Sequence, residues 1–273
     1  MKTHVYLMRK YLSAMLALAA GAAALAMPGA PAHAVPSFAR QTGQTCSSCH
    51  TVFPELTAFG RQFKLRGYTL GNVLDAKEFP YNLPLSASIV ASRTSVKDKR
   101  AIDATEELKR TGETMLQTAA VYYGGKITQK SGAFVQYNYD GVERRGNIEM
   151  ADIRYTDSTT VKDKELLWGV TLNNGPTTQD VWNAAPMWSF PHLADATELM
   201  SSASPLLDMG LARKVGGLGL YGFWDNTLYA ELSFYRTTRR GVMSPLSAGV
   251  PTDTVISGNA PYWHVMYNRE MHP

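Results

Sequence analysis

Five consecutive residues near the N-terminus, Cys46-Ser47-Ser48-Cys49-His50, have the C-x-x-C-H spacing that is typical of covalent c-type haem attachment. The chemistry requires this spacing because two thiols add to the two vinyl groups of one haem, while the adjacent imidazole binds the iron as its proximal ligand. Cys46 and Cys49 are therefore the expected cofactor-binding thiols, and His50 is the expected metal ligand. The expected cofactor is one covalently bound haem c.

The same cysteine pair has three other interpretations: a thioredoxin-like redox couple, part of a zinc site, or a simple disulfide. A structural zinc site needs four ligands, and the sequence holds only 2 cysteines in total. A redox C-x-x-C is expected beside a βαβ pattern, which the flanking sequence lacks. Haem attachment is the interpretation that we favour.

The residues after the motif predict a helix that would hold the haem. An apolar stripe at helical spacing is formed by Phe53, Leu56, Phe59 and Phe63. Pro54 suits the first turn of such a helix, and Gly60 and Gly67 punctuate and end it. The side of this helix opposite the apolar stripe carries the basic residues Arg61, Lys64 and Arg66, and Arg40 lies upstream of the motif. Either these cations form a solvated basic face, or the Phe side chains cover the porphyrin while one or two cations meet its propionates.

Residues 1–34 have the pattern of a cleaved secretion signal. Its features are a basic start, an apolar run and a small-residue cleavage site: Lys2, Arg9 and Lys10, then 12–27, then Ala32-His33-Ala34. A membrane anchor is the alternative, but an apolar run of about 16 residues is shorter than the roughly 20 that span a bilayer. Loss of three basic residues and no acid would lower the net charge from +4 to +1, so nothing calls for a nucleic-acid partner.

Downstream of about residue 84, short runs alternate between apolar and polar residues, as in β-strands with two different faces. In the clearest run, Leu228, Ala230, Leu232 and Phe234 alternate with Tyr229, Glu231, Ser233 and Tyr235. Eight such runs predict strands at 84–92, 115–127, 133–140, 148–156, 165–173, 215–224, 227–235 and 261–268. A charged fraction of 18% argues against a disordered chain.

Two architectures fit these strands: a transmembrane β-barrel, or a soluble β-sandwich with one wet face per sheet. The predicted connections run about 22, three, seven, eight, 41, two and 24 residues in chain order. If the haem unit is periplasmic, the first, fifth and seventh connections lie outside the cell and the two shortest lie in the periplasm, which is the asymmetry of a barrel. Aromatic residues near strand ends fit interfacial girdles: Tyr122, Tyr123, Trp168, Trp224, Tyr235, Trp263 and Tyr267.

The expected fold is therefore mainly β. A short α-helical haem c segment over 35–80 precedes an antiparallel transmembrane β-barrel region over 81–273, of which about eight strands are visible. An eight-stranded barrel is only wide enough for its own side chains, so haem would not fit inside it. Either the haem unit caps a small barrel, or a second chain completes a larger one, or the chain is a shortened relative of a larger barrel. We favour the last.

Three stretches carry a resemblance to a known family: Phe38–Gly43, Cys46–Thr51 and Phe59–Lys64. They are similar to the start of the outer-membrane monohaem cytochrome c–porin fusions, which include the outer-membrane iron-oxidising cytochromes of chemolithotrophic bacteria. The specific resemblance covers about residues 36–70, and downstream the likeness is architectural. It implies that Cys46 and Cys49 hold the haem, that His50 is its proximal ligand, and that electrons cross the outer membrane, without implying that iron is the donor.

The leading functional hypothesis is a c-type cytochrome of the cell outer membrane, an electron carrier rather than an enzyme. It would transfer electrons between an extracellular donor or acceptor, Fe(II) being one candidate, and periplasmic carriers. The alternative is a porin-like channel or binding protein with a structural or sensory haem. A haem peroxidase is disfavoured because the sequence shows neither a second C-x-x-C-H nor a distal acid–base pair.

The spacing does not identify the sixth iron ligand. Candidates are the histidines and methionines of the mature chain: His192, His264, His272, Met115, Met150, Met187, Met200, Met209, Met243, Met266 and Met271. His264 shares its strand parity with Tyr262 and Met266, which would let it point inward. The long connection 174–214 is expected either to fold inward as a plug or to form an external loop.

Overall fold

The computed structural model describes residues 35–71, 83–93, 112–141, 144–184, 211, 214–237 and 255–269. The predicted signal peptide, residues 1–34, lies outside these. Three short helices come first: α2 (Pro36–Thr42), α3 (Cys46–Cys49) and α4 (Ala58–Leu65). Eight strands follow: β1 (Leu85–Arg93), β2 (Thr114–Lys126), β3 (Ser131–Asp140), β4 (Arg145–Val161), β5 (Lys164–Asn173), β6 (Gly216–Trp224), β7 (Leu228–Arg236) and β8 (Ala260–Tyr267), with the 3-10 helix η3 (Pro176–Gln179) after β5. No helix in these ranges is long and apolar enough to cross a membrane.

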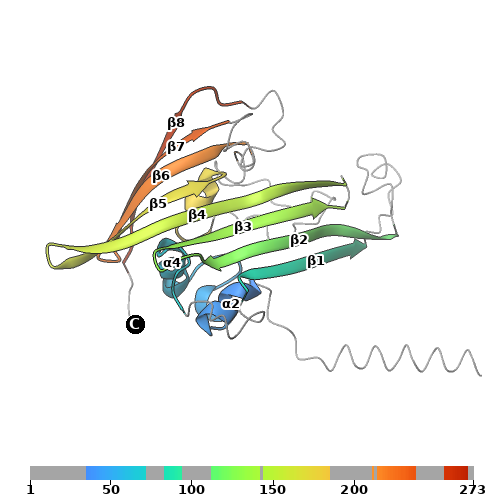
Figure 1. Cartoon of the computed structure of the whole chain (residues 1–273), viewed down its shortest axis with the longest axis horizontal. Helices are drawn as coiled ribbons and strands as arrows, with labels where there is room; N and C mark the ends of the chain where they lie inside the picture. The colour runs from blue at the N-terminus through green and yellow to red at the C-terminus, as the bar shows by residue number, and fades with distance from the viewer. Residues whose placement is uncertain are drawn as a thin grey trace, which may run out of the picture. The chain divides into compact units, whose positions relative to one another are not determined.

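The eight strands form one antiparallel sheet in chain order, β1 to β8 (Figure 1). All eight predicted strands are confirmed, and so is the mainly β, antiparallel fold. Every ladder joins strands that are consecutive in sequence, and none joins β1 to β8 among the described residues. The sheet is therefore open at both edges, and the described part of the chain contains no second sheet of the kind a sandwich requires.

The β3–β4 and β4–β5 connections are shorter than the sequence predicted. β4 continues to Val161, so the predicted eight-residue connection to β5 is only Lys162-Asp163, with φ of 51° and 60°. Asp225 and Asn226 have the same left-handed conformation, φ 53° each, between β6 and β7. Such pairs match the twist of hairpin strands. All three turns at this end of the sheet, which we call the short-turn end, are therefore short, the third being 127–130.

The two faces of the sheet differ in an unusual way. On β7, Ser233 is 0% exposed while its neighbours Leu232 and Phe234 are each 48% exposed. The same alternation holds on β4, where Asp152 and Arg154 are buried and the apolar side chains between and after them are exposed. The polar side is thus the buried one, which we call the inner face, and the apolar side is the outer face. A soluble sheet with one wet face has the opposite arrangement.

The inner face is buried because residues 35–71, the N-terminal segment, and residues 174–184 pack on it. A small apolar core lies between these segments and β5–β8, formed by Leu65, Leu167, Val181, Tyr221, Phe223, Tyr229 and Met266, with Trp182 beside it. Nearer the β1 edge of the sheet, and still on the inner face, the ring of Phe38 on α2 lies 5.9 Å from that of Phe134 on β3. The described part of the 174–214 connection therefore folds inward, which agrees with the expectation of an inward-folding connection rather than an external loop.

Two of the expected girdle aromatics do not face outward. Tyr235 is 2% exposed on the inner face, and the Tyr122 ring stacks on Phe134, with ring centroids 6.2 Å apart. Both positions belong to the inner-face parity of their strands. Tyr122 OH lies 3.0 Å from Ser88 Oγ, whereas Tyr235 OH is buried with no hydrogen-bond partner among the described residues. Trp263 and Tyr267 are strongly exposed on the outer face, as expected of a girdle.

Candidate functional site

The motif forms its own short helix. α3 contains the four residues Cys46–Cys49, and the His50 backbone N–H closes its turn by donating to Cys46 O at 3.0 Å. Residues three apart lie on one side of a helix, so one turn brings both cysteines to the same side. Both thiols are free and half-buried, so the structure does not contain the disulfide considered above. Burial, followed by the neighbouring Cys46, raises the pKa of the Cys49 thiol.

His50 is held by its Nδ1 atom. This nitrogen lies 3.2 Å from Pro54 O and 3.2 Å from Glu55 O. Carbonyl oxygens only accept hydrogen bonds, so Nδ1 carries the proton and Nε2 keeps its lone pair. Burial lowers the pKa of His50 below its ordinary value of 6.5, and the two backbone hydrogen bonds oppose this shift. The imidazole is thus neutral at pH 7 and oriented in the form that binds a metal ion through Nε2.

The loop that follows His50 supplies those carbonyls. Residues 51–55 turn back, so that His50 and Leu56 form an antiparallel bridge, and the Phe53 ring lies 5.3 Å from the His50 ring. The predicted helix start at Pro54 is therefore wrong, and α4 begins at Ala58. The helix is capped by Thr57, whose hydroxyl accepts from Gly60 N, and Pro54 and Glu55 lie before it in the turn beside the imidazole. Their carbonyls have no signature in the sequence.

Thr57 joins α3 to α4. Its hydroxyl donates to Ser48 O at 2.6 Å and accepts from Gly60 N at 3.1 Å, and its backbone N–H donates to Cys49 O at 2.9 Å. Gly60 makes the close approach possible, because a Cβ at this position would lie 2.2 Å from Cys49 O. The cysteine-bearing turn is thereby fixed on the helix that docks against the sheet.

The basic residues of α4 do not form a solvated face, so that expectation is wrong. Lys64 is buried, and its Nζ donates to Asp180 O at 2.7 Å and to Asn183 Oδ1 at 3.1 Å. Burial, and then Arg154, lowers the pKa of Lys64 to about 8. These contacts exist because α4 lies under residues 180–183.

Two other cations of the N-terminal segment also bind protein groups. Arg66 Nη2 lies 2.9 and 2.8 Å from the two carboxylate oxygens of Glu165 on β5. Arg61 donates to Leu56 O at 3.2 Å and its guanidinium lies 5.9 Å from the centre of the Trp182 ring. Cations that were expected to contact haem propionates thus bind protein groups in the structure.

The predicted phenylalanine stripe is divided between two environments. Phe63 is buried, 4.9 Å from Phe38 and 5.8 Å from Tyr68 between ring centroids. Phe63 therefore helps to hold the N-terminal segment together, with its ring buried against Phe38 and Tyr68. Phe59 is exposed at 37%, and Phe53 lies beside His50.

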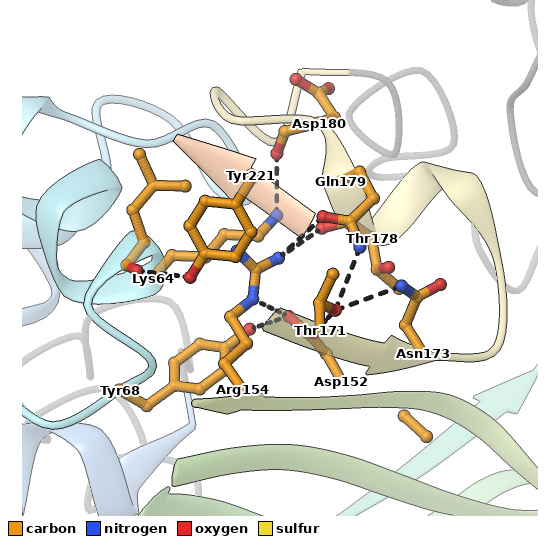
Figure 2. A network of polar contacts seen from close by, with 12 residues as sticks. Lys64, Tyr68, Asp152, Arg154, Thr171, Asn173, Thr178, Gln179, Asp180 and Tyr221 are labelled. Atoms are coloured by element: carbon orange, nitrogen blue, oxygen red, sulfur yellow. Dashed lines mark hydrogen bonds and ion pairs between the residues drawn. The ribbon is translucent and has the colours of Figure 1, made fainter. Parts of the chain in front are cut away.

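A buried ion pair anchors the N-terminal segment on the inner face (Figure 2). Arg154 Nε and Asp152 Oδ2 are 2.7 Å apart, and each side chain is 1% exposed. The same carboxylate accepts from Tyr68 OH at 2.6 Å and, through Oδ1, from Thr171 Oγ1 at 2.9 Å. Asp152 thus joins the N-terminal segment to β4 and β5. A buried charge pair is tolerated when hydrogen bonds satisfy its other atoms, and here Arg154 Nη1 is the atom of the pair that is buried without a partner among the described residues.

Further bonds extend the network to η3 and β6. Arg154 Nη2 donates to Thr178 O and to Gln179 Oε1, each at 3.3 Å, and its guanidinium lies 5.0 Å from the Tyr221 ring centre (Figure 2). Tyr221 OH donates to Leu65 O at 2.6 Å. The alternation within the predicted strand 148–156 puts Asp152 and Arg154 on its polar side, but nothing in the sequence indicates that Asp152 contacts Tyr68 of the N-terminal segment.

The sixth-ligand candidates are placed in part. Met115 and Met266 are buried, and Met150 is half-buried. His264 lies opposite Glu231 in the β7–β8 register, its ring 5.8 Å from that of Tyr229, and its Nδ1 is buried with no hydrogen-bond partner in the described residues. The remaining candidates, His192, His272, Met187, Met200, Met209, Met243 and Met271, lie outside the described residues.

An open cavity of about 560 Å³ lies beside α4 at the short-turn end, lined among others by Phe59, Arg61, Phe223 and Tyr267. Its volume is within the range of cofactor pockets. No three His, Cys, Asp or Glu side chains of the described ranges gather as a metal-binding group. Compared with protein-family models, curated proteins and solved structures, the chain has no match.

Proposed function

We propose that this chain is a monohaem c-type cytochrome of the outer membrane. It would transfer electrons between an extracellular donor or acceptor and periplasmic carriers. Its N-terminal segment would hold the haem, and its sheet would form part of a membrane-spanning β-barrel. When bound, the haem would supply reversible one-electron exchange between Fe(II) and Fe(III).

The orientation of His50 is the observation that carries the haem proposal. Its Nδ1–H is directed at the Pro54 and Glu55 carbonyls, which leaves Nε2 free for iron. Cys46 lies one helical turn before His50 and Cys49 directly before it, and both are free thiols that could form the two thioether bonds. The residues present therefore fit the group that the C-x-x-C-H motif implies. The resemblance of residues 36–70 to the cytochrome–porin fusions supports the same assignment.

The sheet supports the membrane half of the proposal. On β4 and β7 the outer face exposes apolar side chains, and the inner face holds mainly polar ones beside the small apolar core, which is the alternation of an outer-membrane barrel. The three turns at one end are short, as periplasmic turns are. The N-terminal segment lies near that end, because Arg66 binds Glu165 at the start of β5 and Gln62 binds Asn226 in the β6–β7 turn. The haem segment would thus lie inside the periplasmic mouth.

Haem attachment is tested by expressing the full chain with a c-type maturation system and staining denaturing gels for haem. The protein should carry covalent haem, and Cys46→Ala with Cys49→Ala should remove it, whereas Ser47→Ala, between the two cysteines, should not. An unstained band for the unaltered chain would refute the haem half. Fractionation tests the other half: haem-positive protein in the outer membrane is expected, and a soluble periplasmic band would refute the barrel.

Electron transfer is tested in liposomes that contain an oxidised dye, with a membrane-impermeant reductant outside. Holoprotein should reduce the enclosed dye, and the Cys46→Ala, Cys49→Ala variant should not. If solute passes at the same rate whether the haem is oxidised, reduced or absent, the alternative function, a channel with a structural or sensory haem, replaces electron transfer.

A further inference from the structure

The inner face of the sheet already holds more than an eight-stranded barrel can enclose. The interior of such a barrel is filled by the side chains of its own strands. Here α2, α4 and η3 pack on the inner face, and the packed residues Leu65, Tyr68, Gln179 and Val181 are all buried. Pairing of β1 with β8 in the same chain would have to expel these segments. The sheet therefore needs more strands to surround its contents.

Both edge strands of the sheet, β1 and β8, could pair with a further strand. Within the described residues, β1 pairs only with β2, and β8 only with β7. Exposed edges are usually protected by charges, prolines or bulges. β1 has one charge, Arg93 at its end, and a bulge at Val90/Ala91, and β8 has no Asp, Glu, Lys or Arg and has Pro261 near its start. The rest of each strand is unprotected, and Ile89 and Trp263 are 77% and 72% exposed.

The two edge strands are complementary in strand direction and in the faces that their side chains occupy. Because the sheet has eight antiparallel strands, β1 and β8 run in opposite directions, with Leu85 and Tyr267 both at the short-turn end. β8 of one molecule beside β1 of another would thus continue the antiparallel order. It would also continue the faces, since Ser86 and His264 lie on the inner side of the two edge strands. Both carry a buried polar atom, Ser86 Oγ and His264 Nδ1, without a hydrogen-bond partner among described residues.

We propose that two copies of this chain close one 16-stranded barrel, with β1 of each copy paired to β8 of the other. This inference rests on the barrel half of the proposed function. A two-fold axis along the barrel makes both seams identical and leaves no free edge. Barrels of 16 strands leave a wide lumen, which accommodates both N-terminal segments and therefore two haems. A second copy is the occupant because it supplies both missing edges in one closed assembly.

The seam is tested in the outer membrane of cells that express the full chain with its haem. With Leu85 beside Tyr267, Ala87 of one copy lies opposite Val265 of the other, both on the outer face. The double variant Ala87→Cys, Val265→Cys should give a disulfide-linked two-chain band on a non-reducing gel, and neither single variant should. Since barrel strands can be staggered, Trp263→Cys and Tyr267→Cys are each combined with Ala87→Cys as well. The matched control combines Ala87→Cys with Ala230→Cys, an outer-face residue one strand inside the edge, opposite Val265.

The detergent-extracted protein should have the mass of two chains and carry two haems. Cross-linking within one chain, or a haem-loaded outer-membrane particle of one chain, would overturn the paired barrel and leave the proposed function intact. Haem-positive protein in the soluble periplasm would instead overturn the membrane half of the proposed function, and the paired barrel with it. Cross-linking of the Ala230→Cys control would show that the sheet register differs from the one described, and would also overturn the seam.

Discussion

Removing one hydroxyl should loosen the N-terminal segment without disturbing the rest of the sheet. In Tyr68→Phe, the ring still stacks on Phe38, whose centroid lies 5.4 Å away, but the hydrogen bond from Tyr68 OH to Asp152 is lost. A hydrogen bond to a charged group contributes about 1.5–3 kcal/mol. Asp152 keeps its bonds to Arg154 and Thr171, so its charge stays paired and the lower value applies.

A loss of about 1.5 kcal/mol raises the population of the detached segment roughly tenfold, since 1.36 kcal/mol corresponds to a factor of ten. Tyr221→Phe should act in the same way but more weakly, because Tyr221 OH binds a neutral acceptor, Leu65 O. Neutral hydrogen bonds contribute about 0.5–1.5 kcal/mol, which is roughly a two- to tenfold change. The ranking of the two variants is therefore part of the prediction.

The assay is hydrogen exchange of the α4 backbone amides in detergent, followed by mass spectrometry. Tyr137→Phe, which alters a half-exposed outer-face tyrosine, is the control and should leave exchange unchanged. The reasoning is refuted if α4 exchanges within twofold of the unaltered protein in Tyr68→Phe. It is also refuted if the β7 amides accelerate as much as those of α4, because the sheet itself would then be opening.

Three further predictions concern other parts of the site. The pKa of buried Lys64 is about 8 against an ordinary 10.5, so the unfolded chain binds more protons than the folded one between these pH values. The free energy of unfolding should therefore rise by about 2 kcal/mol from pH 7 to 9.5, and the thermal midpoint in detergent should rise with it. Lys64→Met should lose this rise, and a midpoint that falls equally in both proteins would contradict the prediction. Gly60→Ala places a Cβ 2.2 Å from Cys49 O, which should cost about 1–3 kcal/mol and weaken the haem stain. Gly222→Ala, whose Cβ would meet its nearest atom at 3.4 Å, should retain both stability and stain, and equal stain in both variants would count against the packing of α3 on α4. Leu232→Lys puts a charge on the outer face and should destabilise the folded protein by about 2–4 kcal/mol if that face contacts lipid, measured by urea unfolding in bilayers. Thr159→Lys, near the end of the β4–β5 hairpin, is the matched control, and equal effects of the two would argue against a lipid-facing surface.

The strands were predictable because their signal is local. Alternation of apolar and polar residues places a strand without knowledge of its neighbours. β4 was predicted too short because Ser158, Thr159 and Thr160 are polar on both faces, so the alternation stops while the pairing with β5 continues. Tyr122 and Tyr235 were assigned to the girdles because a tyrosine near a strand end suits either face.

The site was predictable in its chemistry but not in its support. Cys46, Cys49 and His50 stand together in the sequence, and their spacing alone indicates haem. The carbonyls that orient His50 belong to backbone, which any residue supplies. Lys64 has the pattern of a surface residue, and only the position of residues 180–183 above α4 shows that it is buried. Partners more than 100 residues apart leave no local signal.

The distances along the chain between these partners set an order of assembly. Tyr68 finds Asp152 across 84 residues, and Leu65 finds Tyr221 across 156. The N-terminal segment is synthesised first, yet its binding surface is complete only after β6 has joined the sheet, since contacts so distant in sequence form late. If haem is attached as proposed, Cys46 and Cys49 would be accessible to a maturation machinery while the strands are still unpaired. The segment that would receive the haem is thus synthesised before the strands on which it docks, and it reaches its place only after they have paired.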